Sequence, residues 1–204
     1  MSVTNEEHRA RMQDVQAEQR RKQKEKTIKR GVVVVLTGDG KGKSTSAFGT
    51  ALRALGHGQR VGLVQFIKGT WDTGEKRMFA QLEGIDHVVS GRGFTWNTQD
   101  RDKDIASVEA GWEAAVRMIE DSRGDDPAYQ LVILDELNIA LGHGYIDAER
   151  VAEVLRNKPT DLSIIVTGRG APQEVIDAAD TVSEVVPIKH AYEAKIRAQK
   201  GVDF

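Results

Sequence analysis

One stretch constrains this chain more than any other: a run of β-branched residues that leads directly into a glycine-rich turn. Residues 31–45 read G-V-V-V-V-L-T-G-D-G-K-G-K-S-T. The apolar run at 32–36 predicts a buried strand, and the residues that follow Thr45 predict a helix over 46–55. A strand, a glycine-rich turn and a helix start together predict a phosphate-binding loop. Glycines let backbone N–H groups approach a phosphate closely, and the helix start adds partial positive charge.

The loop supplies most of the candidate nucleotide ligands. Lys43 is expected to contact the outer phosphates of ATP, and the Ser44 hydroxyl is expected to bind Mg²⁺. Thr37 occupies the position where the usual pattern has its first glycine, and Lys41 adds a second cation. The alternative is a glycine-rich turn that binds nothing. The loop residues predicted to bind ATP are Thr37, Gly38, Asp39, Gly40, Lys41, Gly42, Lys43, Ser44 and Thr45.

A second motif is an apolar strand that ends in two acids. Residues 131–134 are all apolar, and Asp135 and Glu136 follow them. This is the Walker B arrangement, in which a carboxylate at the carboxyl end of a strand lies beside the Mg²⁺ of the phosphate loop. Such a strand can occur by chance, but its pairing with the glycine-rich loop predicts a metal–nucleotide site with Ser44, Asp135 and Glu136 as metal ligands.

Two further cations follow predicted strands. Lys68 comes directly after the apolar run 61–67, and Arg169 follows the apolar run 162–166. Loops that follow strands line the ligand crevice of open α/β sheets, so both residues are candidate phosphate ligands. The alternative for each is an exposed cation with no ligand.

The loop over residues 90–100 carries two aromatic residues, Phe94 and Trp96, in a chain that is only 5% aromatic. One explanation is that both rings pack beneath the loop. The other is that the loop presents both rings to a large flat ligand. The residues alone do not favour either explanation.

Two segments resemble known motifs but lack residues that those motifs require. The aspartates within 100–104 have calcium-loop spacing, but Ile105 and Gly111 stand where such a loop needs Gly and Glu. They are better explained as capping residues of a helix over 105–123. The segment 157–161, N-K-P-T-D, resembles a guanine-reading motif, but its fourth residue is Thr160 and it follows a helix. We interpret it as a turn.

The remaining pattern alternates strands and helices, which predicts an α/β fold. With the phosphate loop, it predicts a three-layer P-loop NTPase (RecA-like) fold with a mostly parallel central sheet. A polar loop is expected at 138–144, and a polar helix is expected after His190, to which we assign no role. The further strands are expected at 61–67, 85–89, 162–166 and 182–188, and the further helices at 75–82 and 147–156.

Residues 1–30 differ from the rest, and we expect them to form an arm separate from a domain at 31–204. They hold nine Lys or Arg against five Asp or Glu, with no Gly or Pro. Such a segment is a charged helix, or is disordered until it docks. It is either a solvated tail or a basic arm that folds over a polyanionic ligand, on its own subunit or on a partner.

Composition excludes several classes of protein. The net charge is −2 over 204 residues, so the chain is no nucleic-acid polycation. The absence of cysteine removes disulfides and thiolate metal sites. No apolar run approaches the ~20 residues of a membrane span, and the N-terminus lacks a secretory apolar core. A cytoplasmic protein without membrane or nucleic-acid partners is therefore expected.

Taken together, six motifs resemble those of the ATP:corrinoid adenosyltransferases, in their P-loop branch. These are T-G-D-G-K-G-K-S-T, V-Q-F-I-K-G, G-F-T-W, L-D-E-L, T-G-R-G and P-I-K-H-A. The resemblance extends over about residues 1–204 and includes the arm. It implies transfer of the 5′-deoxyadenosyl group of ATP to cobalt(I) of a corrinoid, with release of tripolyphosphate. Cobalamin, cobinamide and an a,c-diamide precursor are alternative acceptors.

The resemblance also implies roles for particular residues. Lys43 would hold the triphosphate, and Ser44, Asp135 and, above all, Glu136 would hold Mg²⁺. Phe94 and Trp96 correspond to the aromatic pair that displaces the lower axial ligand of cob(II)alamin. The family's N-terminal helix covers the nucleotide site, and the family forms homodimers. Since no flavin motif is visible, a separate flavin-dependent reductase is expected to supply the electron.

Two other classes of function remain open on the residues alone. A P-loop ATPase or small-molecule kinase would use the same loop and acidic pair but would release orthophosphate or phosphorylate an acceptor. A non-enzymatic nucleotide-binding module would bind ATP without turnover.

Overall fold

The structure is a computed structural model that describes residues 4–67, 72–90 and 100–203. The chain divides into two compact units, Met1–Arg30 and Gly31–Phe204. Among the helices of the described residues, none combines the length and the apolar character that crossing a membrane requires.

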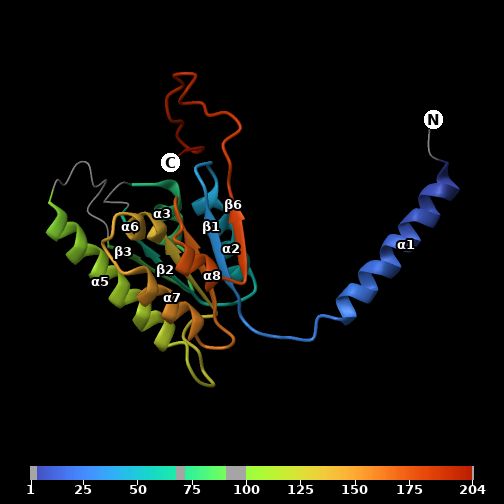
Figure 1. The fold of residues 1–204 in the computed structure, drawn as a ribbon, viewed down its shortest axis with the longest axis horizontal. Coiled ribbons are helices and arrows are strands. Elements are labelled where there is room, and N and C mark those ends of the chain that lie inside the picture. Colours follow the sequence, from blue (N-terminus) through green and yellow to red (C-terminus); the bar gives the residue numbers. More distant parts are fainter. Residues whose placement is uncertain (1–3, 68–71, 91–99, 204) are drawn as a thin grey trace. The chain divides into compact units, whose positions relative to one another are not determined.

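The first unit contains one long helix, α1 (Asn5–Lys24) (Figure 1). A capping box begins it: the Thr4 hydroxyl accepts a hydrogen bond from the Glu7 amide, and the Glu7 carboxylate accepts one from the Thr4 amide at 2.9 Å. None of its residues is buried. The helix is therefore held by its cap and its intrahelical bonds rather than by packing.

The second unit is built on a six-stranded sheet in which every described pairing is parallel. The strand order is β3-β2-β4-β5-β1-β6, so β5 lies between the strand that enters the phosphate loop and the strand that ends in the acids. This is the order of a RecA-like P-loop NTPase sheet, which confirms the predicted fold class. The strands are β1 (Val33–Thr37), β2 (Val61–Gln65), β3 (Ile85–Val89), β4 (Leu131–Asp135), β5 (Ser163–Thr167) and β6 (Thr181–Glu184).

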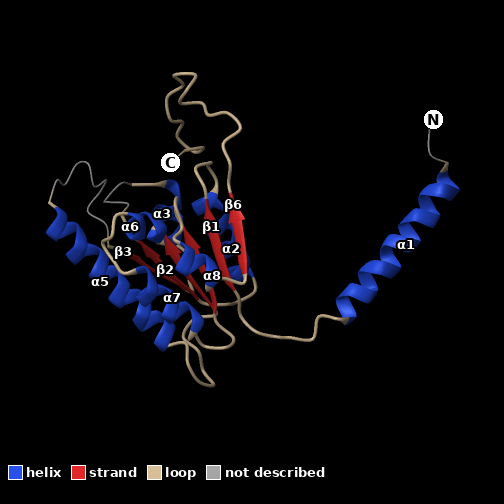
Figure 2. Cartoon of the chain, viewed as in Figure 1, coloured by secondary structure: helices blue, strands red, loops and turns tan. Residues whose placement is uncertain are grey.

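Helices cover both faces of the sheet and give three layers (Figure 2). One face packs against α2 (Lys43–Gly56) and α3 (Gly74–Phe79), in a core that includes Phe48 and Phe79. The Phe48 and Phe79 rings meet edge to face, with centroids 5.3 Å apart. The other face packs against α5 (Arg101–Glu120), α6 (Leu137–Gly142), α7 (Ala148–Arg156) and α8 (Gln173–Asp177).

Alternation along each strand assigns side chains to these two cores. Leu63 and Ile133 belong to the core under α2, whereas Val64 and Leu134 belong to the core under α5. Helix α5 approaches β2 closely because of Gly62, where a Cβ atom would lie 2.7 Å from the Met118 sulfur. Because each face of the sheet packs against its own core, the strands are apolar on both faces, as expected for a buried parallel sheet.

Three sequence-based expectations were wrong. The loop expected at 138–144 is mostly helix α6, because Leu137, Ala140 and Leu141 are buried and favour a helical turn against the sheet. The last strand was expected to reach residue 188 but ends at Glu184, and the chain then turns toward the phosphate loop. The polar helix expected after His190 is absent from the described residues, which form turns there. Its few apolar side chains are exposed, so no packing stabilises a helix.

Candidate functional site

The phosphate loop wraps around the ammonium group of Lys43. Gly38 and Gly42 have φ values of 88° and 118°, which favour glycine. Between them the chain turns so that Lys43 Nζ donates to the carbonyl oxygens of Gly38 at 2.6 Å and Gly40 at 2.7 Å. Lys43 is the first residue of α2 and is only 8% exposed. The loop is thus preformed around a buried cation at a helix start, as an anion site requires.

The chain after β6 braces this loop. The Gly40 amide donates to the Val185 carbonyl at 2.7 Å, and the Val185 amide donates to the Thr37 carbonyl at 2.9 Å. A Cβ atom at Gly38 would lie 2.6 Å from the Val185 carbonyl oxygen. Because backbone occupies this position, residue 38 has to be glycine for reasons of space as well as of φ.

Thr37 fixes a neighbouring loop. Its hydroxyl accepts a hydrogen bond from the amide of Ala171 at 3.1 Å. The glycine of the usual pattern has no such acceptor, so the threonine ties the phosphate loop to residues 168–171 after β5. Asn138 holds the same segment from α6, donating to the Gly168 carbonyl at 3.1 Å.

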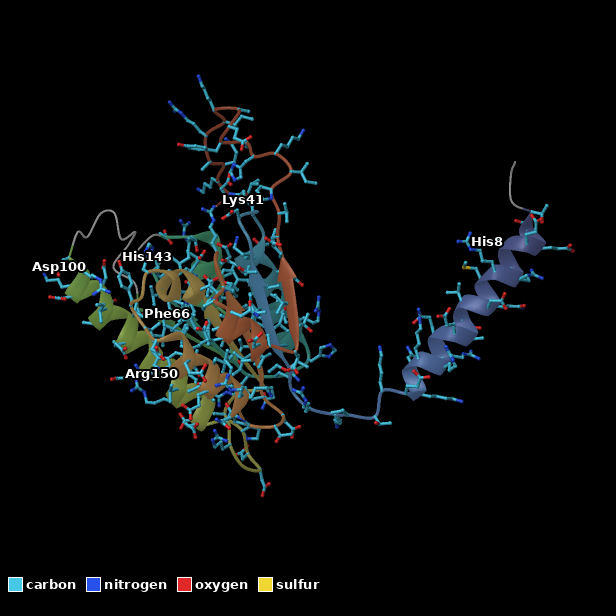
Figure 3. The ribbon with its side chains drawn as sticks, viewed as in Figure 1. His8, Lys41, Phe66, Asp100, His143 and Arg150 are labelled. Carbon is cyan, nitrogen blue, oxygen red and sulfur yellow. The ribbon has the colours of Figure 1, made fainter. Side chains whose placement is uncertain are left out.

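Two other predicted phosphate ligands are paired with acids. Lys41 forms an ion pair with Asp203, and the Lys41 hydrogen bond lowers the pKa of the Asp203 carboxyl. Lys41 lies in the loop between β1 and α2, just below the C-terminal segment in the view of Figure 3. Arg169 Nε lies 3.6 Å from the Asp39 carboxylate. Arg169, Asp39 and Lys41 are largely exposed, so these pairs are weak and a polyanion can displace them.

The acid at the end of β4 is buried. Asp135 is 0% exposed. Its Oδ1 accepts from the Thr167 hydroxyl at 2.8 Å, and its Oδ2 accepts from the Gln65 amide at 2.9 Å. The Thr167 hydroxyl accepts in turn from the Glu136 amide at 3.0 Å. Glu136 has a φ of 63°, which turns the chain sharply from β4 into α6.

The Gln65 amide continues this network to β3. Gln65 Oε1 lies 2.8 Å from His87 Nε2. Burial lowers the pKa of His87, the nearby Lys76 lowers it further, and Asp135 opposes both effects. His87 is therefore mainly neutral at neutral pH.

A hollow of about 820 Å³ lies beside the phosphate loop. The ends of β1 and β5 contribute Thr37, Asp39 and Arg169 to its wall, and α6 contributes Ile139. It therefore combines phosphate-loop backbone with an apolar wall, which suits a substrate with both charged and apolar parts.

The residues present fit a magnesium ion held partly by a nucleotide. Among the described residues no three or more His, Cys, Asp or Glu side chains gather into a metal site. A dedicated all-protein cage is thus absent from this part of the chain. Mg²⁺ is commonly bound by one or two carboxylates together with substrate phosphates. The buried Asp135 carboxylate at the end of β4 is a hard oxygen donor, which is the type of group that such a site uses.

Three predicted site residues, Lys68, Phe94 and Trp96, lie outside the described residues. The flanks of the aromatic segment are described. Ser90 donates its amide to the Gln65 carbonyl at 3.0 Å, and Asp100 caps α5 by accepting from the Lys103 amide at 3.3 Å.

Sequence reasoning missed Gln65, His87, Thr167 and Asn138. Gln65 is the one strongly polar residue within the apolar run 61–67, and that break in the pattern was an available signal. Thr167 lies at the end of its strand, as Asp135 does. Nothing in the sequence near His87 marks it, because its partner is 22 residues away on another strand.

Comparison with known proteins agrees with these features. The family model described as "ATP:corrinoid adenosyltransferase BtuR/CobO/CobP" matches residues 29–204. A "Corrinoid adenosyltransferase" of Pseudomonas aeruginosa is 50% identical over 198 residues, covering 97% of this chain and 95% of that protein. Proteins of Escherichia coli K12 and Salmonella typhimurium, named "Corrinoid adenosyltransferase" and "Corrinoid adenosyltransferase CobA", are each 46% identical over 175 residues. Each of these two matches covers 86% of this chain and 86% of the relative. The chain belongs to the ATP:corrinoid adenosyltransferase family.

Proposed function

We propose that this protein transfers the 5′-deoxyadenosyl group of ATP to the cobalt(I) centre of a corrinoid and releases tripolyphosphate. The observation that carries the proposal is the buried Lys43 within a preformed phosphate loop, in a chain that is 50% identical to a corrinoid adenosyltransferase over nearly its full length. The loop, the acid at the end of β4 and the hollow beside them suit a nucleotide and a second substrate.

The proposed reaction requires stabilisation of the negative charge on the leaving group and alignment of C5′ with cobalt, but no proton transfer. Cobalt(I) donates an electron pair to C5′, a Co–C bond forms, and the C5′–O bond breaks with its electrons on the tripolyphosphate. No general base is needed, because the nucleophile carries no proton to remove. The protein lowers the barrier by neutralising the leaving tripolyphosphate and by aligning C5′ with cobalt. Lys43 and the amides of residues 38–45 suit the first task.

We propose Ser44, Asp135 and Glu136 as the residues that hold Mg²⁺ with the ATP phosphates. When bound, Mg²⁺ neutralises phosphate charge. Thr37, Lys41, Lys68 and Arg169, with the other loop residues, are proposed as ATP ligands. The weak pairs Lys41–Asp203 and Arg169–Asp39 support this, because triphosphate can replace both carboxylates.

We propose that Phe94 and Trp96 hold the lower axial ligand away from cobalt(II), which eases its reduction. Residues 1–30 are proposed as an arm, separate from the domain over residues 31–204, that covers the nucleotide in a cytoplasmic homodimer. A separate flavin-dependent reductase is proposed as the electron source. The capped helix α1, which buries none of its residues, is compatible with an arm that gains packing on binding.

The test is to incubate the protein with ATP, Mg²⁺ and chemically reduced cobalamin or cobinamide. The absorbance spectrum of an alkylated corrinoid should appear together with an equimolar amount of tripolyphosphate. An unchanged spectrum with ATP unconsumed would contradict the proposal. Orthophosphate with ADP would instead support the ATPase or kinase alternative, which the loop and Asp135 alone would also permit.

A further inference from the structure

Four polar side chains form a hydrogen-bonded row across four adjacent strands at the carboxyl end of the sheet. The row runs from His87 on β3 through Gln65 on β2 and Asp135 on β4 to Thr167 on β5. Gln65 and Asp135 are register partners across the β2–β4 pair. By strand alternation, all four lie on the face that packs against α2, the helix that begins at Lys43.

The donors and acceptors of this row run in one direction. Gln65 directs its NH₂ group to Asp135 Oδ2 and its Oε1 to His87 Nε2. Because an amide oxygen can only accept, the His87 Nε2–H group donates a hydrogen bond to Gln65 Oε1. Neutral and protonated histidine both donate from Nε2 in this arrangement, so the direction of the row is the same in either state.

The row orients the Asp135 carboxylate. Thr167 donates to its Oδ1 at 2.8 Å and Gln65 donates to its Oδ2 at 2.9 Å. Because the side chain is 0% exposed, its orientation is set by protein groups such as these rather than by water. A carboxylate fixed in this way is suited to bind a cation that arrives with ATP.

We propose that Gln65 and His87 are positioning residues that orient Asp135 toward the magnesium ion of bound Mg·ATP. This inference rests on the proposed function only in that ATP and Mg²⁺ bind at the phosphate loop. Gln65 acts through Asp135, and His87 acts through Gln65. Neither residue touches the substrates.

The measurement is the factor by which Mg²⁺ tightens ATP binding. Calorimetry gives the ATP dissociation constant in EDTA and in saturating Mg²⁺, and the ratio of the two equals the effect of ATP on Mg²⁺ affinity. No corrinoid is present, so the result does not depend on turnover. Gln65→Met keeps the length of the side chain and removes its amide. The matched control is Gln130→Met. Gln130 makes comparable amide bonds at the amino end of the sheet, accepting from the Arg60 amide at 2.8 Å.

Outer partners of metal ligands typically contribute about 10–100-fold to metal affinity, so the Mg²⁺ factor should fall by about that much in Gln65→Met. Gln130→Met should keep the wild-type factor, even if it unfolds at a lower temperature. A difference between the two variants below about threefold would overturn the proposal, as would a wild-type factor that is itself below about threefold.

A second pair of variants keeps the test decisive if Gln65→Met does not fold. His87→Gln retains a donor for Gln65, whereas His87→Leu removes it. The Mg²⁺ factor should be lower in His87→Leu than in His87→Gln by about threefold or more. Equal factors in the two variants would overturn the role of the row. Failure of wild-type protein to alkylate a corrinoid, with the Mg²⁺ results as expected, would instead count against the proposed reaction alone.

Discussion

Replacing Lys43 by methionine should reduce turnover strongly, because it removes a buried charge and keeps most of the aliphatic stem. Lys43 is 8% exposed and lies 2.6 and 2.7 Å from two carbonyl oxygens of the loop, so its charge is only weakly screened by water. A charge about 4 Å from a phosphate oxygen contributes about 4 kcal/mol at an effective dielectric constant near 20. Because kcat/KM is measured from free enzyme and free ATP, the contributions of this charge to ATP binding and to the transition state both count, and we expect kcat/KM to fall by about 10²–10³-fold.

The assay follows adenosylation of chemically pre-reduced cobinamide at limiting ATP, with circular dichroism and thermal unfolding to establish that the variant is folded. Lys41→Met is the matched control, since Lys41 lies in the same loop but its side chain is 54% exposed and ion-paired with Asp203. Its loss should stay below about tenfold, as expected for a screened surface charge. A folded Lys43→Met within tenfold of wild type, or no worse than Lys41→Met, would refute this reasoning.

Three further outcomes are expected. Trp96→Ala should slow the reaction that starts from cobalt(II) more than the reaction from pre-reduced cobalt(I), and equal losses in the two assays would place Trp96 in general packing. Asp203→Asn removes the acid paired with Lys41, so calorimetry should show about twofold tighter ATP binding; weaker binding would contradict that competition. Burial, followed by the hydrogen bond to Asp86, raises the pKa of Tyr129 to about 12. Tyrosinate absorbance in rapid pH jumps should show one late-titrating group that is lost in Tyr129→Phe. Because the unfolded chain releases that proton near pH 10, the free energy of unfolding should fall between pH 10 and 12. Titration of all three tyrosines near pH 10 would contradict it.

The sequence was sufficient for the fold class because the strands carry long β-branched runs and the helices between them are amphipathic. The predicted strands at 32–36, 85–89, 131–134 and 162–166 agree with the observed ones to within one residue at either end. Helix α5 begins at Arg101, four residues before the expected start, because Asp100 caps it. Local patterns of this kind need no knowledge of which strands are neighbours.

The polar row and the path of the C-terminal segment could not be predicted from the sequence, because both depend on which strands are neighbours. Gln65, Asp135 and Thr167 become partners only through strand order and register, and their separations of 70 and 32 residues leave no periodic signal. The expected strand at 182–188 extends past the end of β6, but among the described residues no strand pairs with Ile188, which is exposed. The chain instead bonds to the phosphate loop through Val185.

The central claim is that C5′ of ATP, and not a phosphorus atom, is the centre attacked. The most direct test uses ATP with ¹⁸O in the bridge between C5′ and the α-phosphorus, with reduced corrinoid as the acceptor. If the C5′–O bond breaks, all of the ¹⁸O should be found in tripolyphosphate and none in the nucleoside product. Label that remains attached to the nucleoside, with orthophosphate or pyrophosphate released, would contradict the account.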